Sequence, residues 1–342
     1  MRWNRSVTVV GVHAEGEVGR VITGGVLPPP GASMFARMRH LAEKDDGLRR
    51  LLLFEPRGAV NHSVNLVTPP CAPEADFGLI IMESQYYVPM SGSNMICAVT
   101  AVLETGLLPM REPETRLTVD TPGGLVHVEA QCRGGRCALV SFRNVPSFVL
   151  HRDRIIKVAG FGEVLVDVAY GGMMYAIVDA QKLGFALIPD EARELVALGE
   201  RIKAAAAEQL PAAHPENPEI HTVNQTLFAG PLTETTNGKT ARNTVVISPG
   251  RLDRSPCGTG TSARLALLHA RGEIAPGEVL DHVSIIGSHF LGTVEEATRA
   301  GDVPAVINRI SGRGFITGIT QYGIDPEDPY PQGFTVPDLW FQ

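Results

Sequence analysis

The stretch DRSPCGTGTSARLALLHARG, residues 253–272, is the segment that decides the expected fold of this chain. Its small residues lead into an apolar run with helical spacing, and Gly272 supplies the usual C-terminal stop. We therefore predict a helix from about residue 259 to residue 270. The first turn of a helix has free backbone N–H groups that bind anions, and glycine lets a ligand approach them closely. No Lys follows the glycines, as a phosphate loop requires, so the segment does not match that motif. A small carboxylate could be the anion if a second such helix start points into the same cleft.

An earlier segment repeats this pattern. PMSGSN, residues 89–94, precedes a second predicted helix, from about residue 93 to residue 104, which stops at Gly106. A shift of 166 positions (257 − 91) superposes the two segments as follows: Ser91 on Cys257, Gly92 on Gly258, Ser93 on Thr259, Gly106 on Gly272, Leu117 on Val283 and Val119 on Ile285. One repeat of about half the chain length indicates a duplicated lobe rather than a solenoid. Chance similarity between two Gly-rich helix starts is the alternative.

Cys257 and Ser91 are the candidate reactive residues. A helix start lowers the pKa of a thiol and raises its thiolate fraction, so we expect Cys257 to be reactive. A buried, inert cysteine is the alternative. Since Ser91 occupies the equivalent place in the repeat, the two side chains suit opposite sides of one bound molecule. Such a pair removes a proton on one face and delivers a proton on the other.

Short β-type runs bounded by Gly or Pro account for much of the remaining sequence, which contains 36 Gly and 25 Pro. Strands are predicted at residues 6–12, 20–23, 78–82, 116–120, 138–142, 163–169, 174–178, 243–248 and 282–286. Two more helices are predicted at residues 32–46 and 190–208. Residues 214–220 and 231–242 are predicted to be loops.

The composition limits the class of protein. A length of 342 residues suggests two domains or one bilobal unit, and 44% hydrophobic with 20% charged residues supports a packed core. No apolar run approaches the roughly 18 residues of a membrane-spanning helix, and the N-terminal sequence is not typical of a secretory signal. A net charge of −7 without a Lys/Arg block argues against nucleic acid or a membrane as partner.

The remaining cysteines and the histidines indicate no metal site and no disulfide framework. The five cysteines include no CxxC pair, which favours a reducing cytoplasm. Cys97 is expected in the core, and Cys132 and Cys137 are expected to face each other across a GG hairpin. The ten histidines show neither HExxH nor HxH spacing. His13 and His289 are the two that could approach a cleft, with a structural role as the alternative for His13.

Motifs in nearly the whole chain resemble those of the proline racemase superfamily. The motifs are VHAEGEVGRVITGG (12–25), EPRG (55–58), PMSGSN (89–94), DTPGGLV (120–126), NVPSF (144–148), VDVAYGG (166–172), DRSPCGTGTSARLALLHARG (253–272) and SIIGSHFLGTV (284–294). The resemblance implies an α+β, diaminopimelate-epimerase-like fold, in which two pseudo-symmetric lobes each wrap a mostly antiparallel sheet around a central helix. It also implies a first lobe of residues 1–143 and 320–342 and a second lobe of residues 144–319.

The resemblance also implies a reaction that needs no cofactor and no metal, on a small proline-type amino acid, in a homodimer. Ser91 and Cys257 would exchange the Cα proton. Asp253 would meet the ring nitrogen, as an ammonium pairs with a carboxylate. The substrate carboxylate would be held by the backbone at Gly92, Ser93, Gly258 and Thr259.

Several residues depart from the pattern of the superfamily. Ser91 stands where its racemases have Cys, Ala59 follows EPRG in place of His, and Ala14 and Val18 replace Thr and Pro. Gln225 falls where hydroxyproline epimerases place a ligand-contacting His.

Because a serine hydroxyl ionises far less readily than a thiol, the Ser/Cys pair argues against an efficient two-thiol proline racemase. The pair resembles the branch of the trans-3-hydroxy-L-proline dehydratases, some with 4-hydroxyproline 2-epimerase activity. The implied reaction is dehydration of trans-3-hydroxy-L-proline to Δ1-pyrroline-2-carboxylate, with 4-hydroxyproline 2-epimerisation as an additional or alternative activity.

Two other classes of function stay open at this point. Cys257 could act as the nucleophile of a hydrolase or acyl transferase, which needs a neighbouring base such as His289 or His13. The chain could also be a binding module that holds a small amino acid between its lobes without chemistry.

Overall fold

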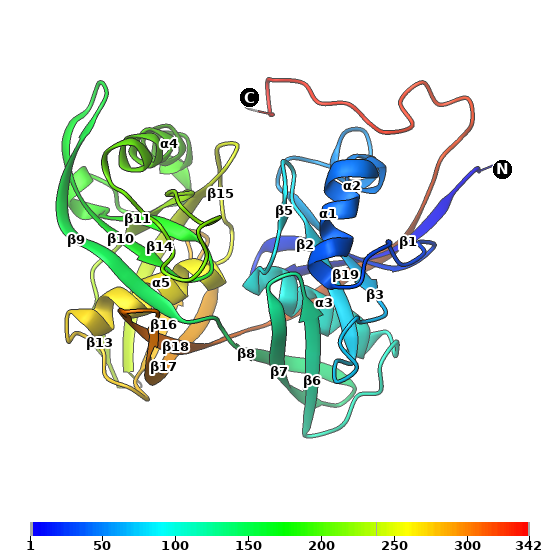
Figure 1. Cartoon of the computed structure of the whole chain (residues 1–342), viewed down its shortest axis with the longest axis horizontal. Helices are drawn as coiled ribbons and strands as arrows, with labels where there is room; N and C mark the ends of the chain where they lie inside the picture. The colour runs from blue at the N-terminus through cyan, green and yellow to red at the C-terminus, as the bar shows by residue number, and fades with distance from the viewer. Residues whose placement is uncertain (1–2, 237, 341–342) are drawn as a thin grey trace. The chain divides into compact units, whose positions relative to one another are not determined.

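The computed structural model describes residues 3–236 and 238–340. The chain divides into two compact units, the first formed by Met1–Phe142 with Gly312–Gln342 and the second by Arg143–Ser311. In Figure 1 the first unit is blue to cyan with a red C-terminal segment, and the second is green to orange. The chain returns to the first unit ahead of the expected position 320, because β19 (Gly314–Gly323) pairs with β1 (Ser6–Ala14) along its whole length.

The sheet of the first unit has a simple order of neighbours. From β19 and β1 it continues through β2 (Glu17–Gly24), β3 (His62–Thr68), β4 (Phe77–Met82), β6 (Glu114–Thr121), β7 (Gly124–Arg133) and β8 (Arg136–Arg143), with β5 (Tyr87–Val88) on the end of β4. The pairs β2–β3 and β4–β6 are parallel, and the other neighbours are antiparallel. Between β2 and β3 lie α1 (Met34–Lys44) and α2 (Gly47–Leu53).

The sheet of the second unit follows the same order. Its strands are β9 (Ser147–Val158), β10 (Gly162–Tyr170), β11 (Met174–Asp179), β12 (Gln225–Ala229), β14 (Gly238–Ile247), β16 (Val279–Val283), β17 (His289–Ala300) and β18 (Val303–Gly312), with β15 (Arg251–Leu252) on the end of β14. The pairs β11–β12 and β14–β16 are parallel, at the same places as β2–β3 and β4–β6. The structure thus carries the predicted repeat in its topology.

A central helix occupies the same place in each unit. α3 (Gly92–Glu104) packs on β1, β2, β3 and β19, and α5 (Gly258–Ala270) packs on β9, β10, β11 and β17. Both helices are buried almost throughout, and most of their residues are accordingly apolar or small. A glycine directly after β10 makes room for α5, since a Cβ at Gly171 would lie 2.2 Å from the carbonyl oxygen of Thr259. The prediction of two central helices is confirmed.

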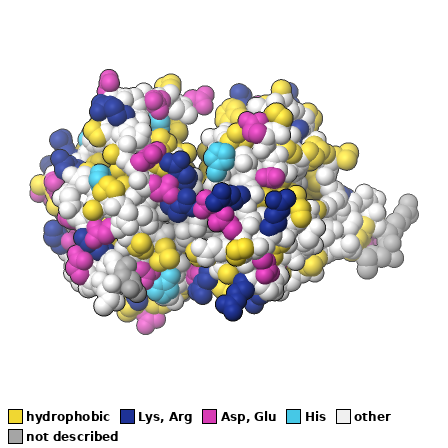
Figure 2. Space-filling view, turned by 90° about the horizontal axis from the view of Figure 1, so that it is seen from below, with side chains coloured by type: hydrophobic (Ala, Val, Ile, Leu, Met, Phe, Trp, Pro, Cys, Tyr) yellow, Lys and Arg dark blue, Asp and Glu magenta, His cyan; other side chains and the backbone are white. Residues whose placement is uncertain are grey.

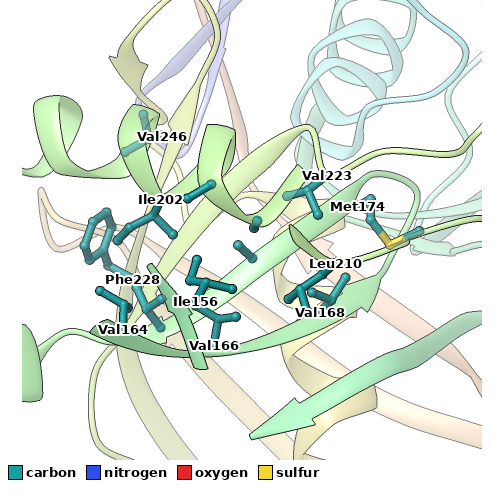
Figure 3. Packing of buried hydrophobic residues seen from close by; sticks show 14 of the residues in the cluster. Ile156, Val164, Val166, Val168, Met174, Ile202, Leu210, Val223, Phe228 and Val246 are labelled. Atoms are coloured by element: carbon teal, nitrogen blue, oxygen red, sulfur yellow. The ribbon is translucent and has the colours of Figure 1, made fainter. Parts of the chain in front are cut away.

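The peripheral helix of the second unit lies over a large apolar core. α4 (Ala192–Gln209), between β11 and β12, confirms the helix predicted at residues 190–208. Figure 3 shows Ile202 of α4 beside Phe228 of β12 and Val246 of β14. In the first unit α1 confirms the helix predicted at residues 32–46, whereas α2 was not expected. No helix in the described ranges is long and apolar enough to cross a membrane.

Two local predictions are wrong. Residues 231–242 are not simply a loop, because β13 (Thr233–Thr235) pairs with the start of β14. The strand expected at residues 282–286 ends at Val283, where Gly287, with φ of 81°, closes a turn onto Ser284. The exposed β13 hairpin lacks the alternation of apolar residues from which strands are predicted. The hairpin of Cys132 and Cys137 is confirmed, since the two residues are register partners and both are free thiols.

Candidate active site

The first unit presents Ser91 at the start of α3. Ser91 is the N-cap residue with extended backbone (φ −150°, ψ 130°), and its carbonyl accepts the N–H of Met95 at 2.9 Å. Its hydroxyl does not cap its own helix. Instead, Oγ accepts a hydrogen bond from Nδ2 of Asn94 at 3.0 Å and lies 3.5 Å from Oγ of Ser93. The Ser91 hydroxyl is therefore in contact with two polar side chains of its own helix and not with the backbone N–H groups of the first turn.

Behind Ser91 lies a buried pair of amides. Oδ1 of Asn94 accepts a hydrogen bond of 2.8 Å from Nδ2 of Asn65, which lies on β3. Both amide side chains are buried, and Oδ1 of Asn65 has no hydrogen-bond partner within the described part of the chain. Sequence patterns gave no sign of this pair, because the two residues are 29 positions apart and each looks like an ordinary polar residue.

The second unit presents Cys257 at the start of α5 in a strained backbone conformation. Its φ of 67° is rare for a residue with a side chain. The carbonyl of Cys257 accepts hydrogen bonds from the N–H of Thr261 at 2.8 Å and from its Oγ1 at 2.7 Å, which hold this conformation. Positive φ at a reactive position is a recurrent feature of functional sites.

Asp253 organises the loop in front of Cys257. Its Oδ1 accepts hydrogen bonds of 2.8 Å from both the N–H and the Oγ of Ser255. Ser255 Oγ in turn accepts the N–H of Cys257 at 3.1 Å. The carboxylate is buried and lies close enough to the thiol to affect its ionisation.

Tyr175 is a site residue that the sequence analysis missed. It lies on β11, is fully buried, and places its hydroxyl 3.3 Å from Sγ of Cys257 and 2.6 Å from Oγ1 of Thr259. The available signal was chemical: a tyrosine in the buried strand MYAIVD needs a partner for its hydroxyl. Gln225, its register partner on β12, is also buried, and its Oε1 has no partner among the described residues.

Burial controls the ionisation of this group. Removal from water, and next the nearby Asp253 carboxylate, raise the pKa of Cys257 to about 12. Burial likewise raises the pKa of Tyr175 well above its usual value. The expected lowering of the thiol pKa by the helix start is therefore wrong, because desolvation and the like charge outweigh it. At neutral pH Cys257 holds its proton.

The histidines do not complete a nucleophile–base pair at Cys257. In the described structure its side chain interacts with Tyr175, Thr259 and the backbone N–H of Gly260, and not with an imidazole. His289 lies 2.8 Å from a carboxylate oxygen of Asp281 and is half exposed. In the first unit, His13 accepts the N–H of Gly16 and stacks on a phenylalanine ring. These contacts favour structural roles and weaken the acyl-transfer alternative.

The candidate site residues thus fall into two groups. Gly92 and Ser93 follow Ser91 in the first turn of α3. Gly258 and Thr259 follow Cys257 in the first turn of α5, with Asp253 hydrogen-bonded through Ser255 to the same loop. In each group the first turn of the helix is buried, and a side chain that carries an exchangeable proton stands immediately before it.

Comparison with known proteins identifies the family of this chain. The family model described as proline racemase matches residues 9–335, nearly the full length. The chain belongs to the proline racemase family. The expected α+β, diaminopimelate-epimerase-like fold is confirmed, since more distant solved structures share it: a Bacillus anthracis phenazine biosynthesis protein of the PhzF family has a TM-score of 0.60 at 11% identity, over 94% of this chain and 100% of that chain.

Two solved structures of this family are much more similar. A hydroxyproline epimerase from Agrobacterium vitis with bound trans-4-hydroxy-L-proline has a TM-score of 0.90 and 42% identity, over 99% of this chain and 97% of that chain. A probable proline racemase from Agrobacterium radiobacter K84 with bound carbonate has a TM-score of 0.89 and 42% identity, over 98% of both chains.

Proposed function

We propose that this protein moves the Cα proton of a hydroxyproline without a cofactor, with Ser91 and Cys257 as the acid/base pair. The observation that carries the proposal is the duplicated, buried helix start, with a proton-bearing side chain at the same place in each copy. Membership of the proline racemase family, and the hydroxyproline bound to the Agrobacterium vitis relative, support this choice of substrate.

In this proposal, both helix starts act on one substrate. The backbone N–H groups at Gly92, Ser93, Gly258 and Thr259 bind the substrate carboxylate. The positive ends of α3 and α5 each favour an anion. Asp253 pairs with the ring ammonium, so a zwitterionic cyclic amino acid is held at both charges. Gln225, with its unpaired carbonyl oxygen, is a candidate contact for a ring hydroxyl.

Substrate binding would also prepare Cys257 for proton transfer. The Asp253 carboxylate is one cause of the raised pKa of the thiol. A ring ammonium placed at Asp253 neutralises that repulsion and adds a positive charge near Sγ, and both effects lower the pKa of Cys257. The thiol thus stays protonated in the ligand-free protein and becomes a proton-transfer group when the correct ligand is bound.

Dehydration of trans-3-hydroxy-L-proline is the first candidate reaction. In this isomer the Cα hydrogen and the 3-hydroxyl lie on the same face of the ring. The Cα–H and C3–O bonds break, a Cα=C3 double bond forms, and the hydroxide leaves with a proton as water. One protein group on that face can take the Cα proton and protonate the leaving oxygen. The resulting enamine tautomerises to Δ1-pyrroline-2-carboxylate.

Epimerisation of 4-hydroxyproline at C2 is the second candidate, and the Agrobacterium vitis relative is the observation that favours it. Epimerisation needs a base on one face of Cα and an acid on the other. It therefore requires both Ser91 and Cys257 in turn, and it suffers more from the weak basicity of a serine oxygen. The Ser/Cys pair is the reason why dehydration is placed first.

The deciding experiment incubates the protein with each isomer of proline, 3-hydroxyproline and 4-hydroxyproline in deuterated water, followed by proton NMR. Loss of water from the trans-3-hydroxy-L isomer supports dehydration. Deuterium at Cα with inversion of a 4-hydroxyproline supports epimerisation. The matched variants Cys257→Ser and Cys137→Ser test the site, because both remove a buried thiol but only the first removes the proposed acid/base group. No exchange with any isomer, together with tight binding of pyrrole-2-carboxylate, would identify a binding module instead.

Three further expectations stay predictions: a homodimer, a cytoplasmic location and independence of added cofactors. Sedimentation of the purified protein tests the first. Unchanged turnover after dialysis against a chelator tests the last. Figure 2 shows basic and acidic side chains next to one another rather than in a continuous basic surface on the face in view, which accords with a small molecule as the partner.

A further inference from the structure

The proposed chemistry requires a serine side chain to act as an acid and a base. When Ser91 gives up its proton, or before it can accept one, its oxygen must bear negative charge. A serine hydroxyl reaches that state far less readily than a thiol. Ser91 is half-buried, so its oxygen also loses part of the stabilisation that water would give it. The protein therefore needs a hydrogen-bond donor fixed at Oγ of Ser91.

Asn94 supplies such a donor, and its orientation is fixed by Asn65. An asparagine amide has one end that donates and one that accepts. Because Asn65 donates to Oδ1 of Asn94 at 2.8 Å, the donating end of Asn94 is directed to Ser91, 3.0 Å away. Asn94 then cannot accept the proton of Ser91, which is left to donate to Oγ of Ser93, 3.5 Å away, or to a substrate.

The buried amides have a cost that packing alone does not explain. Asn65 and Asn94 lie in the core of the first unit, and Oδ1 of Asn65 has no partner there within the described ranges. An unpaired buried carbonyl is unfavourable, and a pair of apolar side chains would avoid it. The sheet also leaves space for this amide: a Cβ at Gly19 would lie 2.8 Å from Oδ1 of Asn94. These features point to a function of the pair other than stability.

The second copy of the repeat meets the same requirement in a different way. The residue equivalent to Asn94 is Gly260 (94 + 166), three positions after Cys257. Its backbone N–H acts on the sulfur as a hydrogen-bond donor that lowers the pKa of the thiol. There is little room for a side chain at this glycine, since a Cβ would lie 3.1 Å from Val245. In each helix, the residue three positions after the reactive residue thus donates one N–H to the reactive atom.

We propose that Asn94, oriented by Asn65, is a positioning residue that stabilises negative charge on Oγ of Ser91. The proposal rests on the proposed function and extends it. When the Oγ–H bond breaks and the proton forms a bond to the substrate, the electron pair left on Oγ is held by the Asn94 N–H. In the reverse direction the same N–H stabilises the oxygen that removes the proton.

A double-mutant cycle tests the proposal, with Asn94→Leu, Ser91→Cys and the double variant. Leucine has the branching and the number of side-chain heavy atoms of asparagine but cannot donate. We expect Asn94→Leu to lower kcat for Cα–deuterium exchange about 100-fold, comparable to loss of one donor to a reacting oxyanion, with little change in KM. In the Ser91→Cys background we expect a loss of less than about fivefold, because a thiol ionises without this donor.

Asn94→Asp is a second variant that keeps the size and polarity of the side chain. Above the pKa of the introduced carboxyl it cannot donate to Ser91, so kcat falls. At acidic pH the carboxyl carries a proton and donates again, so part of the activity returns. A pH profile of this kind is not expected of a residue that only supports the helix.

The outcomes are distinguishable. If the wild-type protein exchanges the Cα proton and Asn94→Leu causes the same loss in both backgrounds, Asn94 is structural and the proposal is overturned. If the wild-type protein exchanges no hydroxyproline proton, the proposed function fails, and with it the reaction in which Asn94 would stabilise Ser91. Circular dichroism and binding of pyrrole-2-carboxylate confirm that each variant is folded.

Discussion

The hydroxyl of Tyr175 lies 3.3 Å from the sulfur of Cys257 and 2.6 Å from the hydroxyl of Thr259, so that three polar side chains form one buried cluster. Tyr175 comes from β11, whereas Cys257 and Thr259 come from the start of α5. The bond from Tyr175 favours the thiolate and opposes the desolvation that raises the pKa of Cys257. Tyr175 therefore partly offsets the effects of burial and of Asp253 on the acidity of the thiol.

The first prediction concerns this hydroxyl. Tyr175→Phe keeps the ring but removes the hydrogen bonds to Cys257 and Thr259. We expect kcat for Cα exchange to fall about tenfold, the effect of losing about 1.4 kcal/mol at a reacting group. NMR time courses with the best hydroxyproline substrate measure this change in kcat.

Tyr170→Phe is the matched control for this prediction. Tyr170 lies on the adjacent strand β10, is also buried, and stacks on Phe148 without a hydrogen bond to the thiol. We expect its kcat to remain within about twofold of the wild type, as for substitutions away from a special interaction. Equal losses in the two variants would show that the Tyr175 hydroxyl has no particular role.

The second prediction concerns the ionisation of Cys257. With a pKa of about 12, the thiol should react with iodoacetamide ever faster up to at least pH 10, without a plateau. Asp253→Asn removes the negative charge but can still accept from Ser255, so it lowers the pKa of Cys257 and speeds alkylation at pH 9 by about tenfold, one pKa unit. Peptide mass spectrometry follows Cys257 separately from the half-buried Cys71.

The same Asp253→Asn variant should lose activity although its thiol is more reactive. In the proposed function the carboxylate binds the ring ammonium, and an amide cannot replace that charge. Asp281→Asn, at an exposed carboxylate beside His289, should change neither the alkylation rate nor turnover. Slower alkylation after Asp253→Asn would contradict the assigned cause of the raised pKa.

Much of the fold could be predicted from local sequence. The small-residue starts and glycine stops of α3 and α5 are contiguous signals, and the predicted helices match the observed ones within a residue or so. The repeat was visible because both helix starts keep the same spacing to the strand that follows. By contrast, β13 is exposed on all three of its residues, so no apolar alternation marks it.

The chemistry around the reactive residues could be predicted only in part. Ser91 and Cys257 stand out because they are next to glycines, but Tyr175 contacts Cys257 across 82 positions and Asn65 contacts Asn94 across 29. Such contacts arise from strand order, which periodicity does not encode. The expected low pKa of Cys257 was wrong for the same reason: the sequence shows the helix start but not the depth of burial or the place of Asp253.

The third prediction concerns the contact between β10 and the start of α5. Gly171 follows β10, and a Cβ there would lie 2.2 Å from the Thr259 carbonyl and 2.4 Å from the Ala263 nitrogen. Backbone cannot move away as a flexible side chain can, so Gly171→Ala should destabilise the protein by about 3 kcal/mol, at the upper end of overpacking effects. Urea denaturation followed by fluorescence measures it.

Gly318→Ala is the matched control, since its Cβ would meet no atom within 4 Å and its backbone is not in the left-handed region. We expect a change of less than about 0.5 kcal/mol for this substitution, as for most surface positions. A small effect of Gly171→Ala would mean that the sheet and α5 can separate at this point without loss of stability.

The fourth prediction concerns His282, a fully buried histidine of β16 whose Nδ1 lies 2.8 Å from Oγ1 of Thr261. Burial, and next the positive charge of Arg264, lower its pKa to about 3, below the value of about 6.5 in an unfolded chain. Between these pH values the unfolded chain binds a proton that the folded protein does not, so stability falls as the pH falls. From pH 6.5 to pH 5 the loss from this group is about 1.6 kcal/mol, because the histidine of the unfolded chain is already half protonated at pH 6.5. His282→Asn keeps a polar partner for Thr261 but cannot be protonated, so the free energy of unfolding of this variant should change less over this range. The control is His127→Asn, at an exposed histidine of β7, which should follow the wild type. Parallel urea titrations at pH 7, 6 and 5 measure the three slopes, and the same slope for His282→Asn as for the wild type would exclude His282 as the acid-sensitive group.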